Sequence, residues 1–240
     1  MQTELLLGFY TLLTSTLAGM MGLGGGTLLI AIMPIYLPGT AIVPIHGLVQ
    51  LASNSSRMLF SLRSVAWNLV SKFIAGSLFG IALIGLLLAN IPTRYIPVFI
   101  ALYILLNIWV PPFSRFIRKY ENFYIVGLVQ GGLGLLIGAT GPLAVPLLVK
   151  ELEGDKDRVV ATNAFFMGFS HLAKIFVFGL IGFSFAGYFW LLIFMIAGAI
   201  LGSGLGTLLR GKINADLFAR LLNYVLTGLA FNMLYQVFTA

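Results

Sequence analysis

The ionisable side chains inside the apolar stretches of this sequence are basic or histidine. Arg57 and Lys174 fall within predicted membrane spans, and His171 precedes Lys174 by three residues. Acidic residues occur only at the termini or in predicted loops: Glu4, Glu121, Glu151, Glu153, Asp155, Asp157 and Asp216. A cation carrier normally keeps a carboxylate at membrane depth, whereas a buried cation is costly unless it faces a negative partner. The inventory therefore predicts a small anionic substrate.

Amide side chains extend both basic positions into polar helix faces. Asn54 lies three residues before Arg57, and Gln50 lies four residues before Asn54, so one face of a helix carries all three. His171 and Lys174 have the same spacing of three residues. His171 could hydrogen-bond an anion or shuttle a proton near neutral pH. The alternatives are basic side chains that snorkel to the interface and a purely structural histidine.

Two glycine motifs interrupt apolar stretches, Gly22-Leu23-Gly24-Gly25-Gly26 and Gly138-Ala139-Thr140-Gly141-Pro142. A helix broken at membrane depth must face protein or a wet cavity, and the N-terminus of the next half-helix can bind an oxyanion. Pro142 suits the first turn of such a helix. The alternative is close helix packing through small residues. The predicted substrate contacts at the two breaks are Gly24, Gly25, Gly26, Thr140, Gly141 and Pro142.

The composition requires a membrane environment. Of 240 residues, 60% are hydrophobic and 9% are charged, whereas soluble domains carry about 25% charged residues. The lysines and arginines behind the net charge of +7 lie mostly between apolar stretches, as in cytoplasmic loops, so we expect no nucleic-acid partner. The chain has no cysteine, and we predict no cofactor or metal site.

Stretches suited to a hydrocarbon core about 30 Å thick cover residues 5–37, 41–62, 65–89, 94–110, 124–149, 159–181, 186–209 and 217–238.

The second four stretches resemble the first four. Asn54 and Arg57 align with His171 and Lys174, and His46 aligns with Asn163 at the helix entrances as a weaker candidate pair. Two glycine stripes also align, and we expect them to pack helices closely: Gly76/Gly80 and Gly198/Gly202/Gly206. The sequence thus predicts an all-α polytopic membrane protein of two homologous four-span units, residues 1–112 and 124–240, joined by a basic linker at 113–123.

The basic loops favour opposite orientations for the two units. Arg63 and Lys72 flank the connection after the second stretch, whereas Lys150, Lys156 and Arg158 follow the fifth. Because basic loops stay in the cytoplasm, equivalent loops face opposite sides, which predicts an inverted repeat. Each unit then opens with a re-entrant or hairpin segment broken at its glycine motif, and both termini lie outside the cytoplasm. The alternative is eight plain crossings with a parallel repeat.

The glycine motifs and the duplicated layout resemble the sulfite exporter TauE/SafE family over nearly the whole chain. The resemblance implies a multi-pass protein of the prokaryotic plasma (inner) membrane that exports sulfite, sulfoacetate or related organosulfonates. We expect a secondary transporter and not an enzyme, driven by a coupling proton or ion, by the substrate gradient or by a partner protein, because no nucleotide-binding loop is present. The alternatives are an anion channel and an intramembrane enzyme, for which Ser203 would need to approach His171.

Overall fold

The computed structural model describes residues 2–21, 24–88, 92–119, 121–140, 143–209 and 215–239. Within these ranges the regular secondary structure is entirely helical, which confirms the predicted all-α class. Five of the described helices (α1, α4, α9, α10 and α11) are long and apolar enough to cross a membrane. The α-helices are α1 (Gln2–Met21), α2 (Gly25–Ile32), α3 (Gly39–Phe60), α4 (Trp67–Leu88), α5 (Ile96–Trp109), α6 (Pro111–Arg118), α7 (Phe123–Ile137), α8 (Val145–Glu151), α9 (Lys156–Leu180), α10 (Phe189–Leu208) and α11 (Ala215–Thr239).

The first apolar stretch consists of two helices that fold back on each other. α1 ends at Met21 and α2 begins at Gly25, and Gly24 between them has a φ of 88°. Gly25 packs against the backbone of Thr14, eleven residues earlier. A continuous helix would separate these two residues by about 16 Å. The predicted break at the first glycine motif is therefore confirmed.

The second glycine motif also ends a helix. α7 stops at Ile137, and Gly138 follows with a φ of 68°. The next helix, α8, starts at Val145 and has Pro146 in its first turn. We predicted Pro142 for the first turn of the restarting helix, and the described helix α8 begins at Val145. Gly141 and Pro142 themselves lie outside the described residues.

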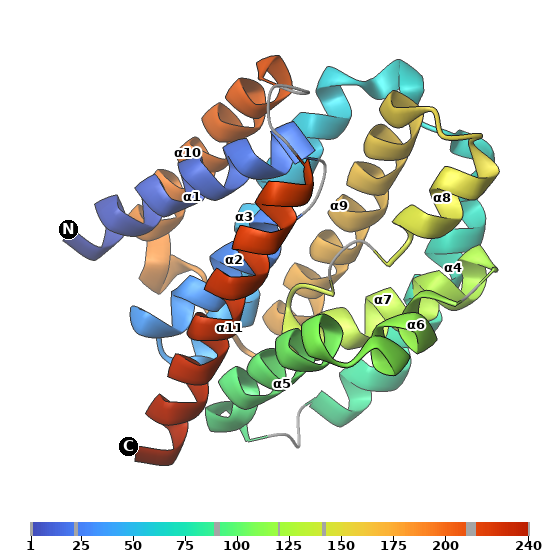
Figure 1. Cartoon of the computed structure of the whole chain (residues 1–240). Coiled ribbons are helices and arrows are strands. Elements are labelled where there is room, and N and C mark those ends of the chain that lie inside the picture. The colour runs from blue at the N-terminus through green and yellow to red at the C-terminus, as the bar shows by residue number, and fades with distance from the viewer. Residues whose placement is uncertain are drawn as a thin grey trace.

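The broken segment of each half packs along the third long helix of the other half (Figure 1). In the α1–α10 pair, a Cβ added to Gly198 would collide with the carbonyl of Gly8, and one added to Gly202 would collide with that of Leu12. The contact advances by four residues on both helices, so α1 and α10 run parallel. Such close backbone contact confirms that the stripe on α10 is a packing surface.

The α4–α7 pair repeats this geometry residue by residue. A Cβ on Gly76 would collide with the carbonyl of Tyr124, and one on Gly80 with that of Leu128. α4 and α7 therefore also run parallel, with the other predicted glycine stripe at their contact. Both pairs bring backbones together through glycine, which is the arrangement that lipid-embedded helices use in place of a hydrophobic driving force.

α3 and α9 cross at the centre of the bundle, and α5 packs against α11 (Figure 1). A Cβ added to Gly47 of α3 would lie 3.6 Å from the Cβ of Lys174 on α9. Further along α3, Asn54 lies beside Gly168 of α9. The residue numbers rise on one helix as they fall on the other, so α3 and α9 are antiparallel.

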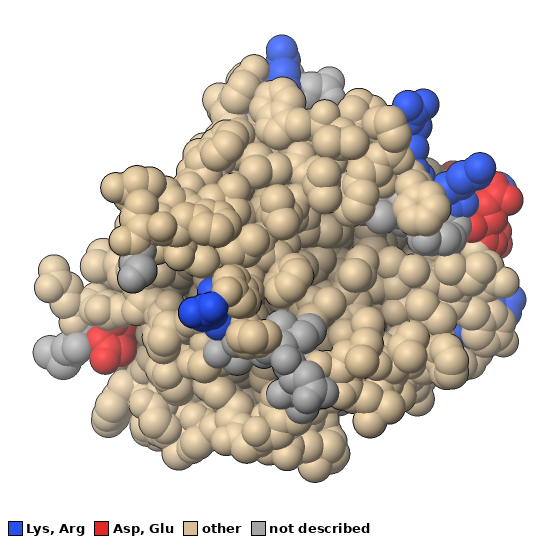
Figure 2. Space-filling view, turned by 90° about the horizontal axis from the view of Figure 1, so that it is seen from below, with Lys and Arg blue, Asp and Glu red and all other residues tan. Residues whose placement is uncertain are grey.

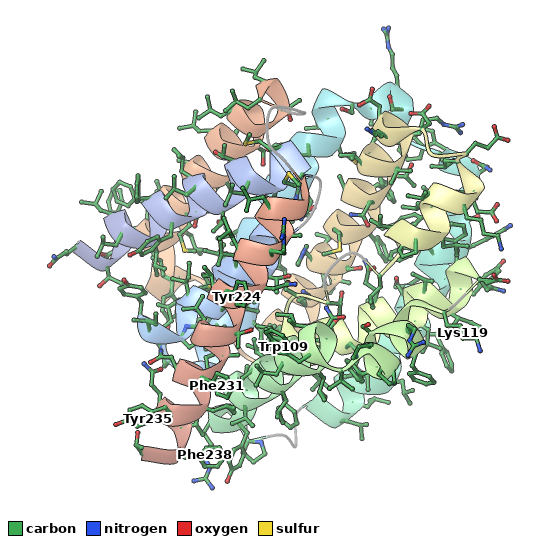
Figure 3. The ribbon with its side chains drawn as sticks, viewed as in Figure 1. Trp109, Lys119, Tyr224, Phe231, Tyr235 and Phe238 are labelled. Atoms are coloured by element: carbon green, nitrogen blue, oxygen red, sulfur yellow. The ribbon has the colours of Figure 1, made fainter. Side chains whose placement is uncertain are left out.

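The outer surface of the bundle is mainly apolar. Figure 2 shows one face on which charged side chains lie mostly toward the edges. On α11, four exposed aromatic side chains follow one another along the helix (Figure 3), namely Tyr224, Phe231, Tyr235 and Phe238. A surface of this kind suits a lipid environment.

Candidate functional site

Arg57 lies inside the bundle near the C-terminal end of α3, with only 6% of its surface exposed. Its Nη2 donates to Oδ1 of Asn54 at 2.7 Å, and its Nη1 donates to the carbonyl of Ala18 at 3.3 Å. Ala18 belongs to the last turn of α1, whose end carbonyls carry partial negative charge. The guanidinium therefore points into the protein, toward the break after α1, and does not snorkel to the interface.

Lys174 occupies the equivalent place on α9 and is 2% exposed. Its Nζ donates to the carbonyl of Gly138, at the C-terminal end of α7, and lies 3.0 Å from Nδ1 of His171. The lysine stem passes between Gly47 of α3 and Gly134 of α7. Each buried basic side chain thus meets carbonyl groups at the end of the broken helix that opens its own half.

Two buried histidines face each other edge to face, with the ring centroids of His46 and His171 5.7 Å apart. Nε2 of His46 lies 2.9 Å from the carbonyl of Gly26, which can only accept, so Nε2 carries the ring proton. While Lys174 keeps its ammonium hydrogens, Nδ1 of His171 must accept, and the ring proton of His171 lies on Nε2. Among the described residues, neither Nδ1 of His46 nor Nε2 of His171 has a hydrogen-bond partner. The buried pair therefore offers one acceptor and one donor.

A row of predicted site residues runs along α3. Nδ2 of Asn54 donates to the carbonyl of Gln50 at 2.8 Å, while Oδ1 of Asn54 accepts from Arg57. At the other end of the row, a Cβ on Gly26 would lie 3.0 Å from Oε1 of Gln50, so only a glycine fits without displacing the amide. The structure thus connects Gly26, Gln50, Asn54 and Arg57 as neighbours.

The start of α2 lies beside this row. Its N-cap residue, Gly24, has no side chain to bond the first-turn N–H groups. Gly25 packs against the backbone of Thr14 and the side chain of Ala18, the residue whose carbonyl accepts from Arg57. The first break and the guanidinium are therefore in one neighbourhood.

The second glycine motif lies differently with respect to its helix. Thr140 is buried, and its carbonyl accepts from the hydroxyl of Tyr103 on α5. Thr140 precedes the start of α8 by five residues. It therefore does not lie at a helix N-terminus, which is where we predicted it. The predicted contacts Gly141 and Pro142 fall outside the described residues.

Gln130 of α7 is a buried amide that we did not predict from the sequence. Its Nε2 donates to the sulfur of Met167 on α9 at 3.2 Å, and its Oε1 has no partner among the described residues. Asn163, the weaker candidate on α9, likewise has an unpartnered Oδ1 within the described ranges. A lone amide in the apolar stretch 124–149 was the available signal for Gln130.

Ser203 does not pair with a histidine. Its Oγ lies 3.0 Å from Oγ of Ser53 and donates to the Ser53 carbonyl at 3.1 Å, and Oγ of Ser53 also donates to Ser15. These three serines join α1, α3 and α10 through hydrogen bonds at their crossing. This geometry gives no support to a serine nucleophile activated by His171.

An apolar helical bundle with basic and polar side chains buried where its central helices cross defines a polytopic membrane protein with an internal polar site. The sequence matches the family described as Sulfite exporter TauE/SafE over residues 7–233. The chain therefore belongs to this family of membrane transporters, which confirms the resemblance noted in its motifs. Comparison with curated proteins gives no match, and comparison with solved structures gives none either.

Proposed function

We propose that this protein is a secondary transporter that exports a sulfur-containing or organic oxyanion, such as sulfite or sulfoacetate, across a prokaryotic plasma membrane. The observation that carries the proposal is the burial of Lys174. Among the described residues its partners are a carbonyl and an imidazole, and no carboxylate is paired with it. A buried ammonium without a counter-charge favours an anionic partner.

In this proposal the oxyanion binds between α3 and α9. Lys174 and Arg57 supply the opposing charge, and the Nε2 proton of His171 and the amides of Asn54 and Gln50 supply hydrogen bonds. The first break contributes backbone N–H groups at Gly24, Gly25 and Gly26. At the second break, the residues proposed to contact the anion are Thr140, Gly141 and Pro142. Support comes from the connected row on α3 and from the unpartnered nitrogen of His171.

We further propose that the chain is an inverted repeat of two four-span units, 1–112 and 124–240, with the linker 113–123 in the cytoplasm and both termini outside. In an inverted repeat, a two-fold axis in the membrane plane relates the two units, so equivalent central helices such as α3 and α9 are antiparallel. In a parallel repeat the same helices are parallel. The antiparallel α3 and α9 support the inverted form, whereas the residue-by-residue match between the α1–α10 and α4–α7 contacts supports the repeat itself. Alternating access would then rock one unit against the other around a fixed site.

Labelling of single cysteines tests the orientation, since the chain has no cysteine of its own. Gly39→Cys and Asp155→Cys should react with a membrane-impermeant maleimide from opposite sides of the membrane. Reaction from the same side would contradict the inverted repeat and leave the parallel repeat in its place.

Transport into proteoliposomes tests the function. Radiolabelled sulfite and sulfoacetate should enter by a saturable process when the protein is present, and an organic cation of similar size should not. Equal entry of the cation would contradict an anion site. Large single-channel currents without saturation would instead support an anion channel. Energy coupling is tested by imposing a proton gradient, which should change the rate if a proton moves with the anion.

A further inference from the structure

A second hollow lies away from the central site, between α4, α5, α6 and α7. It is a cavity of about 550 Å³ that is open on one side. Its lining is glycine, aliphatic and aromatic, and the hydroxyl of Tyr103 is already bonded to the carbonyl of Thr140. Leu102 and Phe99 of α5 line it and are also exposed. A lining of this kind suits a hydrocarbon chain and not a polar solute.

The depth of the cavity matches a lipid tail. Along α7 the lining runs from Leu128 to Ile137. Nine residues of helix span about 13 Å, close to the roughly 15 Å that one leaflet contributes to a 30-Å hydrocarbon core. One acyl chain can therefore lie lengthwise against α7.

The short helix α6 places positive charge at one end of this cavity. Phe113 and Phe116 line the cavity, and Phe116 also lines a surface depression shared with Arg115 and Lys119. Both basic side chains are exposed, and Lys119 projects outward beyond α6 in Figure 3. α6 thus carries aromatic side chains in the cavity and basic side chains next to them, a combination found in helices that lie in the membrane interface.

We propose that the cavity and α6 together form a binding site for an anionic phospholipid. One acyl chain fills the cavity, and the phosphate lies at Arg115 and Lys119. Basic residues beside a gap between membrane helices favour anionic headgroups, which concentrate in the cytoplasmic leaflet. A zwitterionic lipid can fill the same cavity, but its headgroup carries no net charge to match the two cations. This site does not depend on the proposed transport function.

An occupied cavity would also touch the second break. The lining includes Ile137, the last residue of α7, and Tyr103, which holds the Thr140 carbonyl. An acyl chain in this place packs against the C-terminal end of α7. The next residue, Gly138, has the carbonyl that accepts the hydrogen bond from Lys174.

Counting bound lipids on the purified full chain by native mass spectrometry tests the headgroup site. The probes are phosphatidylglycerol and phosphatidylcholine with the same tails. The variant Arg115→Gln/Lys119→Gln should bind phosphatidylglycerol about 25-fold more weakly, since each interfacial basic residue changes affinity by about fivefold. The matched control, Arg63→Gln/Arg94→Gln, removes two exposed charges that lie outside α6 and the cavity lining and should bind like the wild type. Equal affinity of the wild-type chain for both lipids, or an unchanged α6 variant, would overturn the proposal and indicate non-selective surface lipid.

A second pair of variants tests the cavity. Leu102→Trp places a larger side chain in the cavity, whereas Leu201→Trp does the same on an exposed position of α10. Leu102→Trp should weaken binding of long-chain phosphatidylglycerol severalfold and leave a six-carbon form unaffected. If both tryptophan variants bind the long-chain lipid equally, the acyl chain does not occupy the cavity and the proposal is wrong.

Discussion

Replacing Lys174 by methionine is the sharpest test of the anion site. Methionine has a similar length and no charge, so the variant removes the ammonium while it fills most of the space between Gly47 and Gly134. The Gly138 carbonyl and the His171 Nδ1 each lose a donor. The helices around the site should otherwise keep their places, because the lysine stem contacts them through carbon atoms.

Two effects of this substitution have different sizes. A hydrogen bond to a charged group contributes about 1.5–3 kcal/mol, so loss of the contact to the oxyanion should raise KM by about 10- to 150-fold. Folding loses about 1–3 kcal/mol for each buried group left unsatisfied. The folded variant also avoids the desolvation cost of burying the ammonium, so the net change in the free energy of unfolding is small. Transport should therefore fall far more than the unfolding temperature.

The assay is initial-rate sulfite uptake into proteoliposomes, with the unfolding temperature of each variant measured in detergent. Lys72→Met is the matched control, since Lys72 is exposed on α4 and its loss should leave KM unchanged. Lys174→Arg keeps the charge and should retain part of the activity. A Lys174→Met protein that is folded and has a KM within twofold of the wild type would refute the anion site at this residue.

Three further predictions concern the same architecture. Arg57→Met should impair transport about as much as Lys174→Met in the uptake assay, because the two residues hold equivalent positions; full activity would exclude Arg57 from the site. His171→Phe removes the Nε2 donor to the anion together with the Nδ1 acceptor for Lys174. Loss of the one neutral hydrogen bond to the anion should raise KM by about 2- to 12-fold, a smaller change than loss of the ammonium; an equal or larger change in uptake kinetics would give the imidazole a further role. Gly76→Ala should lower stability in thermal unfolding by about 1–3 kcal/mol, because its Cβ would collide with the Tyr124 carbonyl. In contrast, Gly85→Ala on the same helix meets only side chains at 3.8 Å and should be neutral or stabilising by up to about 1 kcal/mol; equal effects would contradict close packing at Gly76.

Local sequence predicted the features that depend on backbone freedom and spacing. Helix breaks at Gly24 and Gly138 follow from glycine, which adopts positive φ without penalty. The glycine stripes on α4 and α10 follow from a spacing of four residues, which puts small side chains on one helix face. The shared polar face of Gln50, Asn54 and Arg57 follows from helical periodicity in the same way.

Features that depend on tertiary placement were not accessible in the sequence. Whether Arg57 faces the end of α1 or the start of α2 depends on how the hairpin docks, and its contact with the Ala18 carbonyl decides for α1. The hydrogen bond from the Tyr103 hydroxyl to the Thr140 carbonyl joins residues 37 positions apart, so the local sequence does not show it. Gln130 was overlooked because a single amide changes the hydropathy of an apolar stretch very little.

The parallel contact between α1 and α10 has a consequence for biosynthesis. The backbone of α1 at Gly8 is covered by Gly198, about 190 residues later in the chain. At 5–20 residues per second, a ribosome needs about 10–40 s to add that many residues. During this interval α1 is already made while the helix that covers it is not. The protein therefore cannot complete its packing from the N-terminus onward, and a translation product that stops before α10 leaves its first helix without its main partner.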